Sequence, residues 1–153
     1  EAACEAALTD TDWPARLQRL RHGPLVQAAG NAEVWLDGGH NGAAGMALAE
    51  ALTRLPERPL HLICGMLNTK DVGGYMRPLA PLVKTLHAIP VPDEVATLSA
   101  SDTCKVAQNV GMTAFEARST DAALGEIIRK SPNARILICG SLYLAGHVLR
   151  HNS

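Results

Sequence analysis

The stretch WLDGGHNGAAG, residues 35–45, indicates the class of fold to which the chain belongs. An apolar run ends in an acid and two glycines, and a helical pattern begins directly after a histidine and an asparagine. From Gly42 to Leu55 apolar residues recur at the spacing of one helical face, and Pro56 ends the pattern. The stretch is therefore typical of a strand that turns through a polar loop into a helix.

The same alternation of short apolar runs and helical stretches continues to the end of the chain. Strands are expected at residues 60–64, 84–91, 113–117 and 135–139. Helices are expected at residues 73–83, where prolines interrupt the pattern, and at 101–111, 119–131 and 141–150. The second of these helices is expected to start at Ser101 or Asp102, and the third to be capped by Ser119 or Thr120.

Residues 24–37 contain two short apolar runs around Gly30 and Asn31, a combination that favours a β-hairpin. That hairpin would add one antiparallel strand at an edge of the sheet. The predicted fold is a Rossmann-like, three-layer α/β sandwich with a mostly parallel sheet of about six strands and one antiparallel edge strand. Residues 1–22 are interpreted as a lead-in segment and linker, and residues 23–153 as the domain itself.

Composition limits the functions that the chain can have. A formal net charge of −1 and 3% aromatic residues give no electrostatic or stacking signature of a nucleic-acid or anionic-membrane binder. No apolar stretch has the length of a membrane span, and no secretory leader is recognised. None of the four cysteines forms a C-x-x-C pair, so we expect a reducing, cytoplasmic compartment without a disulfide or zinc framework.

Three of the expected strands end alike, in WLDGGHN, LICGMLNTKD and LICGSLYLAG. Each passes from apolar residues into glycine and then into polar residues, and the ends of parallel strands lie along one edge of a sheet. Ligands of open α/β sheets bind at this carboxyl edge, where glycine permits close backbone approach. The side chains expected to converge there are Asp37, His40, Asn41, Asn68, Lys70, Asp71 and Ser141.

Each of these candidates also has a purely structural interpretation. Asp37 can cap a turn, and His40 can be an ordinary surface histidine. Lys70 and Asp71 can form a solvated loop pair. Ser141 is first of all an N-cap for the last helix, although the helix N-terminus that it caps also attracts carboxylate or phosphate.

Other motifs narrow the chemistry further. The cluster Arg16, Arg19 and Arg21 is interpreted as a solvated face from which one arginine can reach a phosphate. His147 and His151 have the i, i+4 spacing of metal ligands but no carboxylate or cysteine nearby in sequence, so no metal site is expected. The stretch GGHNGAAG lacks the spacing of a dinucleotide site, and the chain contains neither a P-loop motif nor a G-x-S-x-G elbow.

Four motifs in fixed order resemble a known family: WPARLQRL, VWLDGGHN, GMLNTKD and CGSLYLAG. They are similar to the C-terminal domain of folylpolyglutamate synthase / dihydrofolate synthase, in the Mur ligase superfamily. The departures are mild, with Ala15 and Gly39 in place of the usual glycine and alanine and Gly42 in place of the usual proline.

The resemblance implies an ATP-dependent ligase that joins L-glutamate to dihydropteroate or folate through an acyl phosphate. It implies that the P-loop and the Mg²⁺ ligands lie in a larger N-terminal ATPase domain, so the 153-residue chain by itself is expected to be inactive. By position in the motifs, Arg16 and Asp37 would contact ATP. The residues that would bind glutamate are His40, Asn41 and Ser141, and those that would line the cleft between the domains are Lys70 and Asp71.

Two other interpretations stay open at the level of sequence. The C-terminal domain of a cell-wall Mur ligase would share the fold and an A-H-N motif, but usually with a tyrosine just before it, where this chain has Gly38. A freestanding module that binds a small ligand is the third possibility.

Overall fold

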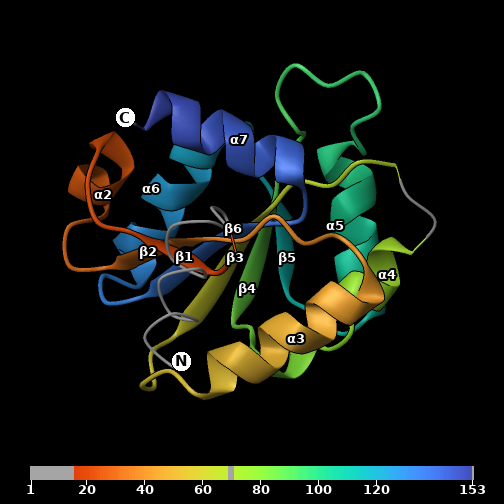
Figure 1. The fold of residues 1–153 in the computed structure, drawn as a ribbon, viewed down its shortest axis with the longest axis horizontal. Coiled ribbons are helices and arrows are strands. Elements are labelled where there is room, and N and C mark those ends of the chain that lie inside the picture. The colour runs from red at the N-terminus through yellow and green to blue at the C-terminus, as the bar shows by residue number, and fades with distance from the viewer. Residues whose placement is uncertain (1–15, 69–70, 153) are drawn as a thin grey trace, which may run out of the picture.

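The computed structural model describes residues 16–68 and 71–152, and these residues form a single six-stranded sheet with helices on both faces (Figure 1). The strands are β1 (Gln18–Leu20), β2 (Glu33–Leu36), β3 (Leu60–Cys64), β4 (Thr85–Ala88), β5 (Ala114–Glu116) and β6 (Arg135–Cys139). Their order is β1-β2-β6-β3-β4-β5, and only the β1–β2 pair is antiparallel. The predicted sheet, with its antiparallel edge strand, is confirmed.

The helices divide into two layers. One face of the sheet is covered by α2 (Pro24–Ala29), α6 (Thr120–Lys130) and α7 (Leu142–His151). The other is covered by α3 (Gly42–Thr53), α4 (Val72–Met76), the short 3₁₀ helix η2 (Ala80–Leu82) and α5 (Ala100–Asn109). This is the predicted three-layer sandwich, and none of the helices in the described residues is long and apolar enough to cross a membrane.

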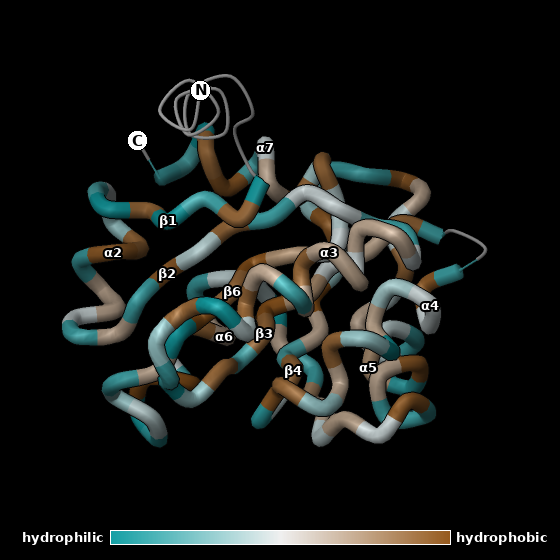
Figure 2. The backbone as a smooth tube through the Cα atoms, turned by 60° about the horizontal axis from the view of Figure 1, so that its bottom comes forward, coloured by the Kyte–Doolittle hydropathy of each residue, from teal (hydrophilic) through white to brown (hydrophobic). Residues whose placement is uncertain are grey.

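The two central strands explain why the chain folds this way. Every residue of β3 and β6 is buried, as expected for parallel strands that are covered on both faces. Alternate side chains enter opposite cores: Ile63 packs with α6 and α7, whereas Leu62 and Cys64 pack with α3, α4 and α5. Hydrophobic colour accordingly runs along the inner strands in Figure 2. Each fully buried leucine or isoleucine contributes about 1.5–3 kcal/mol relative to an exposed one.

The predicted hairpin at residues 24–37 is wrong, because its first half is helix α2. Pro24 occupies the first turn of this helix, where its fixed φ angle is favourable, and Gly30 ends it with a φ of 63°. The Oδ1 atom of Asn152 accepts a hydrogen bond from the Leu25 N–H at 2.8 Å, so a distant residue satisfies this helix end. The antiparallel edge strand is β1 instead, which comes from the segment interpreted as a lead-in.

The helix starts follow side-chain caps. The Ser99 side chain accepts a hydrogen bond from the Asp102 N–H and caps α5, so the helix begins at Ala100, one residue before the expected Ser101. Of the two caps considered for α6, the structure has Ser119, which accepts from the Ala122 N–H at 3.1 Å. Cys64, Cys104 and Cys139 are buried free thiols.

Candidate functional site

The carboxyl edge of the sheet brings together residues that lie far apart in sequence. The ends of β2, β6 and β3 are neighbours; Asp37 follows β2 directly, and Ser141 follows β6 after Gly140. Two further backbone bonds extend these pairings, from Asp37 N–H to the Ile138 carbonyl at 3.0 Å and from Gly65 N–H to the Cys139 carbonyl at 3.1 Å. The three similar strand ends therefore lie along one edge of the sheet.

Asp37 holds the start of the described chain against this edge. Its two carboxylate oxygens accept the N–H groups of Leu17 and Gly39, both at 2.9 Å. Leu17 has a φ of 43°, a left-handed conformation that leucine rarely adopts, and Asp37 fixes it there. Burial raises the pKa of the Asp37 carboxyl, although those two hydrogen bonds and the charge of Arg16 act in the opposite direction. The exposed Arg16 lies beside the end of β2, where its charge acts on Asp37.

His40 and Asn41 lie at the N-terminus of α3. Asn41 caps this helix, with its Oδ1 atom 2.8 Å from the Ala44 N–H. His40 precedes the cap and is exposed. No acidic residue lies in the first turn of α3, so no carboxylate within that turn cancels the positive end of the helix dipole.

Asp71 lies next to the same helix terminus. Its side chain accepts a hydrogen bond from the Gly74 N–H at 3.1 Å and caps α4. A Cβ atom on Gly42 would lie 3.5 Å from the Asp71 Oδ2 atom, and a Cβ atom on Gly45 would collide with the Tyr75 carbonyl oxygen. The glycines of the GAAG motif thus let α3 pack closely on α4. Lys70 lies outside the described residues.

Ser141 caps α7 from inside the protein. Its Oγ atom accepts the N–H groups of Tyr143 and Leu144 at 3.0 and 3.4 Å, and the residue is only 2% exposed. Gly140 before it has a φ of 111°, and a Cβ atom there would lie 2.7 Å from the Gly65 carbonyl oxygen. Ser141 is therefore the predicted N-cap. Its Oγ atom accepts two hydrogen bonds, and its hydroxyl proton can donate one.

Exposed apolar side chains surround this edge, and sequence reasoning missed them. We call them the apolar rim: Met46, Val95, Leu142 and Tyr143, with exposed fractions of 66%, 104%, 63% and 57%. Met46 lies in the second turn of α3, Leu142 and Tyr143 in the first turn of α7, and Val95 in the loop after β4. These elements all follow the carboxyl ends of strands, and exposed apolar residues in one region of a surface mark interaction sites.

The histidine pair of α7 makes local contacts. The two rings stack at 4.1 Å between centroids, and the His151 Nδ1 atom is 2.8 Å from the His147 carbonyl oxygen. The nearest acid is Asp93, whose Oδ2 atom is 4.0 Å from the His147 Nδ1 atom. Burial lowers the pKa of His147, as do the charges of His151 and Arg150, while Asp93 opposes them. In the part of the chain that the structure describes, no three side chains form a group that could hold a metal ion.

Comparison with known proteins identifies relatives along nearly the whole chain. A family model described as "Dihydrofolate synthetase, C-terminal domain" matches residues 18–151. Folylpolyglutamate synthase of Lacticaseibacillus casei is 31% identical over 145 residues, which cover 92% of this chain and 30% of that protein. A probable dihydrofolate synthetase of Schizosaccharomyces pombe is 26% identical, over 93% of this chain and 35% of that protein. The chain thus spans about a third of the length of these relatives.

Solved structures share the fold. E. coli FolC in complex with DHPP and ADP superposes with a TM-score of 0.72 at 22% identity, over 90% of this chain and 30% of that one. The bifunctional folylpolyglutamate synthase/dihydrofolate synthase with Mn, AMPPNP and L-glutamate bound gives a TM-score of 0.70 at 21% identity, over 90% of this chain and 31% of that one. At these identities the likeness shows the same α/β architecture.

Proposed function

We propose a function from the premise that the chain belongs to the dihydrofolate synthetase C-terminal domain family. In this proposal the chain supplies the glutamate-binding surface and part of the ATP-binding surface of an ATP-dependent ligase. The reaction is the joining of L-glutamate to dihydropteroate, to folates or to both, through an acyl phosphate. Relatives by sequence are named as folylpolyglutamate and dihydrofolate synthases. Structures of the same fold contain ADP, AMPPNP, Mn and L-glutamate.

One observation of this chain carries the proposal. The N-termini of α3 and α7 open onto the same edge of the sheet, and neither helix has an acidic residue in its first turn. Helix N-termini attract anions through unpaired backbone N–H groups and the helix dipole. Glutamate and the phosphates of ATP are both anionic, so an edge with two such termini suits a reaction in which they meet.

The side chains at this edge have chemically suitable roles. Arg16, exposed beside the end of β2, can contact a phosphate. Each oxygen of Asp37 accepts one backbone N–H, and a carboxylate oxygen can accept a second donor, such as a ribose hydroxyl. His40, together with the cap residues Asn41 and Ser141, would bind the carboxylates of glutamate. Lys70 and Asp71 would line the cleft to the partner domain.

Mg²⁺ does not fit the described residues as a resident ion. The carboxylates of Asp37 and Asp71 accept backbone N–H groups, and no third ligand gathers with them. We therefore assign Mg²⁺ to the P-loop domain of the parent enzyme. The contribution of this chain is orientation of glutamate so that its neutral amine faces the acyl phosphate, and such positioning of two reactants accounts for much of the rate in group transfer.

The apolar rim favours a partner domain over a freestanding module. Met46, Leu142 and Tyr143 are each more than half exposed, and covering them removes apolar surface from water. We assign the rim to contact with an N-terminal P-loop domain of the same parent chain. Until that domain closes on the edge, the half-site has no P-loop to complete the ATP site, and the chain alone makes no amide.

The test is an amide-shift titration of the 153-residue chain by NMR, with L-glutamate, Mg-ATP and NAD added separately. The proposal predicts shifts near His40 and Ser141 with glutamate and near Asp37 with Mg-ATP, and none with NAD. His40→Ala should reduce the glutamate response, whereas His22→Ala, another exposed histidine in the described chain, should leave it unchanged. Silence with both glutamate and Mg-ATP, or an equal response in the two variants, overturns the assignment. Glutamate-dependent ATP turnover by the chain alone contradicts the claim that it is half of a site.

A further inference from the structure

A concave site lies at the opposite end of the sheet from the carboxyl edge. A cavity of about 580 Å³ opens where α3 ends and where β3 and β6 begin. About half of its lining is apolar, with Leu52 and Leu55 from α3 and the turn after it, Leu60 from β3, and Leu82 and Val83 from η2 and the residue after it. Sites for small molecules typically have volumes of about 300–1,000 Å³.

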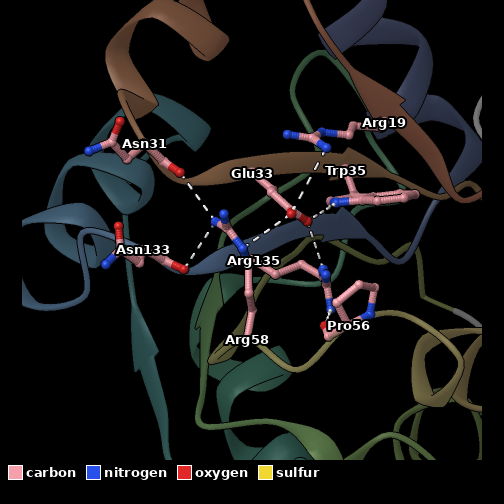
Figure 3. Close-up of polar contacts among 8 residues, drawn as sticks. All are labelled: Arg19, Asn31, Glu33, Trp35, Pro56, Arg58, Asn133 and Arg135. Atoms are coloured by element: carbon pink, nitrogen blue, oxygen red, sulfur yellow. Dashed lines mark hydrogen bonds and ion pairs between the residues drawn. The ribbon is translucent and has the colours of Figure 1, made fainter.

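The polar side of this cavity is built on an ionic network around Glu33 (Figure 3). Glu33 and Arg135 are the first residues of the parallel neighbours β2 and β6 and lie in register, with the Arg135 Nε atom 2.8 Å from Glu33 Oε1. The Nε atom of Arg58 lies 3.2 Å from Glu33 Oε2, and Arg19 is at 3.9 Å. Arg58 also donates to the carbonyls of Asn31 and Asn133, and Arg135 to that of Pro56.

Positive charge exceeds negative charge at this place. The cavity is lined by Arg58, Arg135, the exposed Lys84 and one acid, Glu57. Glu33 neutralises only part of that charge, because it is shared among three arginines. The chain as a whole has a formal net charge of −1, so this excess is a local feature rather than a general property of the surface.

We propose that this cavity binds a small amphiphilic anion, a molecule with one carboxylate or phosphate group on an aliphatic body. Its anionic group would lie against Arg58 and Lys84, and its body against Leu55, Leu82 and Val83. Two properties distinguish the cavity from a purely structural ion network: its aliphatic side and a lysine, Lys84, outside the network. Apolar walls reward an apolar ligand body, and partly desolvated cations strengthen the contact with its charge.

The test titrates the 153-residue chain with four probes: octanoate, octyl phosphate, acetate and octylammonium. Octanoate should shift the amides of Leu55, Arg58 and Lys84, whereas acetate lacks the body and octylammonium has the wrong charge, so neither should saturate at the same concentration. Octyl phosphate distinguishes the two possible head groups. Tighter binding than octanoate assigns the site to phosphate esters, and equal or weaker binding assigns it to carboxylates.

A matched pair of lysine variants tests the contact itself. Lys84→Gln should weaken octanoate binding about two- to fivefold, the effect expected of one exposed charge pair. Lys105→Gln, an exposed lysine on α5 that does not line the cavity, should have no effect. Equal binding of octylammonium and octanoate, equal affinities of the two variants, or shifts confined to His40 and Ser141 would each overturn the proposal. The amides of His40 and Ser141 lie at the carboxyl edge, away from the cavity, so the result of the octanoate titration is independent of the result of the glutamate titration.

Discussion

Glu33→Gln should be among the most destabilising single-atom changes available in this protein. The carboxylate is 10% exposed and lies within 2.8 Å of both Arg135 Nε and Trp35 Nε1. Both donors bind the same oxygen, Oε1, so a glutamine oxygen at that position can accept both of them. The charge is lost, however, and the amide NH₂ group that replaces Oε2 faces the Arg58 Nε atom. The Arg135 side chain, 5% exposed, would remain as a buried cation without its carboxylate.

The size of the effect follows from which contacts are buried. Removing one partner of a buried ion pair costs about 3–5 kcal/mol, and the hydrogen bonds that the glutamine oxygen keeps place the loss at the lower end of that range. Arg19, at 3.9 Å and 37% exposed, adds little. We therefore expect the free energy of unfolding to fall by about 3 kcal/mol, measured by urea denaturation followed by circular dichroism.

The matched control is Glu50→Gln, which removes the carboxylate of an ion pair with Arg54 at the same 2.8 Å. Both side chains of that pair are at least 70% exposed, so the loss should be about 0.5 kcal/mol or less. A loss below about 1 kcal/mol for Glu33→Gln, or similar losses for the two variants, would refute the reasoning from burial. The double variant Glu33→Gln with Arg135→Met should be more stable than additivity predicts, since the unpaired cation is gone.

The same network has a defined pH dependence. Burial acts to raise the pKa of Glu33, but hydrogen bonds from Arg135 and Trp35 and the charges of Arg135 and Arg58 outweigh it and lower the pKa below its usual 4.5. A lowered pKa in the folded state means that the ionised group stabilises the fold above pH 4.5 and that this contribution is lost as the pH falls through the folded value. The stability difference between wild type and Glu33→Gln should therefore be constant near neutral pH and shrink below pH 4.5.

Three further predictions concern packing, capping and protonation. Gly45→Ala should destabilise the protein, because its Cβ atom would collide with a backbone carbonyl of α4. Gly125→Ala, which has open space in α6, should instead stabilise it by about 0.5–1 kcal/mol. Thermal unfolding compares the two variants, and effects of the same sign would contradict the close approach of α3 and α4. Ser141→Ala should lower the free energy of unfolding by about 2 kcal/mol and Ser119→Ala by about 1 kcal/mol, because the Ser141 cap is 2% exposed and the Ser119 cap lies at the surface. Urea unfolding of both variants measures the difference, and the reverse order would contradict the burial argument. Burial lowers the pKa of His87, so the folded state favours its neutral form. The free energy of unfolding should therefore fall as the pH drops below 6.5. If a His87→Phe variant keeps this pH dependence, another group causes it.

The parts of the fold that depend on continuous local patterns were predictable. The bounds of β3 and β6 coincide with the apolar runs at residues 60–64 and 135–139, because every position of a strand buried on both faces must be apolar or satisfied. The start of α2 was not predictable in the same way. Its N-terminal N–H group is satisfied by Asn152, a residue 127 positions away, and no short window of sequence contains both partners.

The candidate site shows a similar division. Glycine and polar residues after three strands were sufficient to predict that the strand ends before Asp37 and Ser141 lie along one edge. They could not show that both side chains accept backbone N–H groups, since the distance from Asp37 to the Leu17 N–H depends on how β1 pairs with β2. The opposite cavity was missed, although the sequence carries one signal: N-A-E and N-A-R open strands β2 and β6, with opposite charges in matching positions.

Where this chain can bind an anion depends on what its acidic side chains already contact at each edge of the sheet. At the carboxyl edge the carboxylates of Asp37 and Asp71 accept backbone N–H groups, so much of their charge is offset before a ligand arrives. At the amino edge Glu33 is shared by three arginines. A nearly neutral chain can thus present two regions of positive potential. Binding at both should weaken as salt rises, more at the exposed Lys84 than at the partly buried terminus of α7.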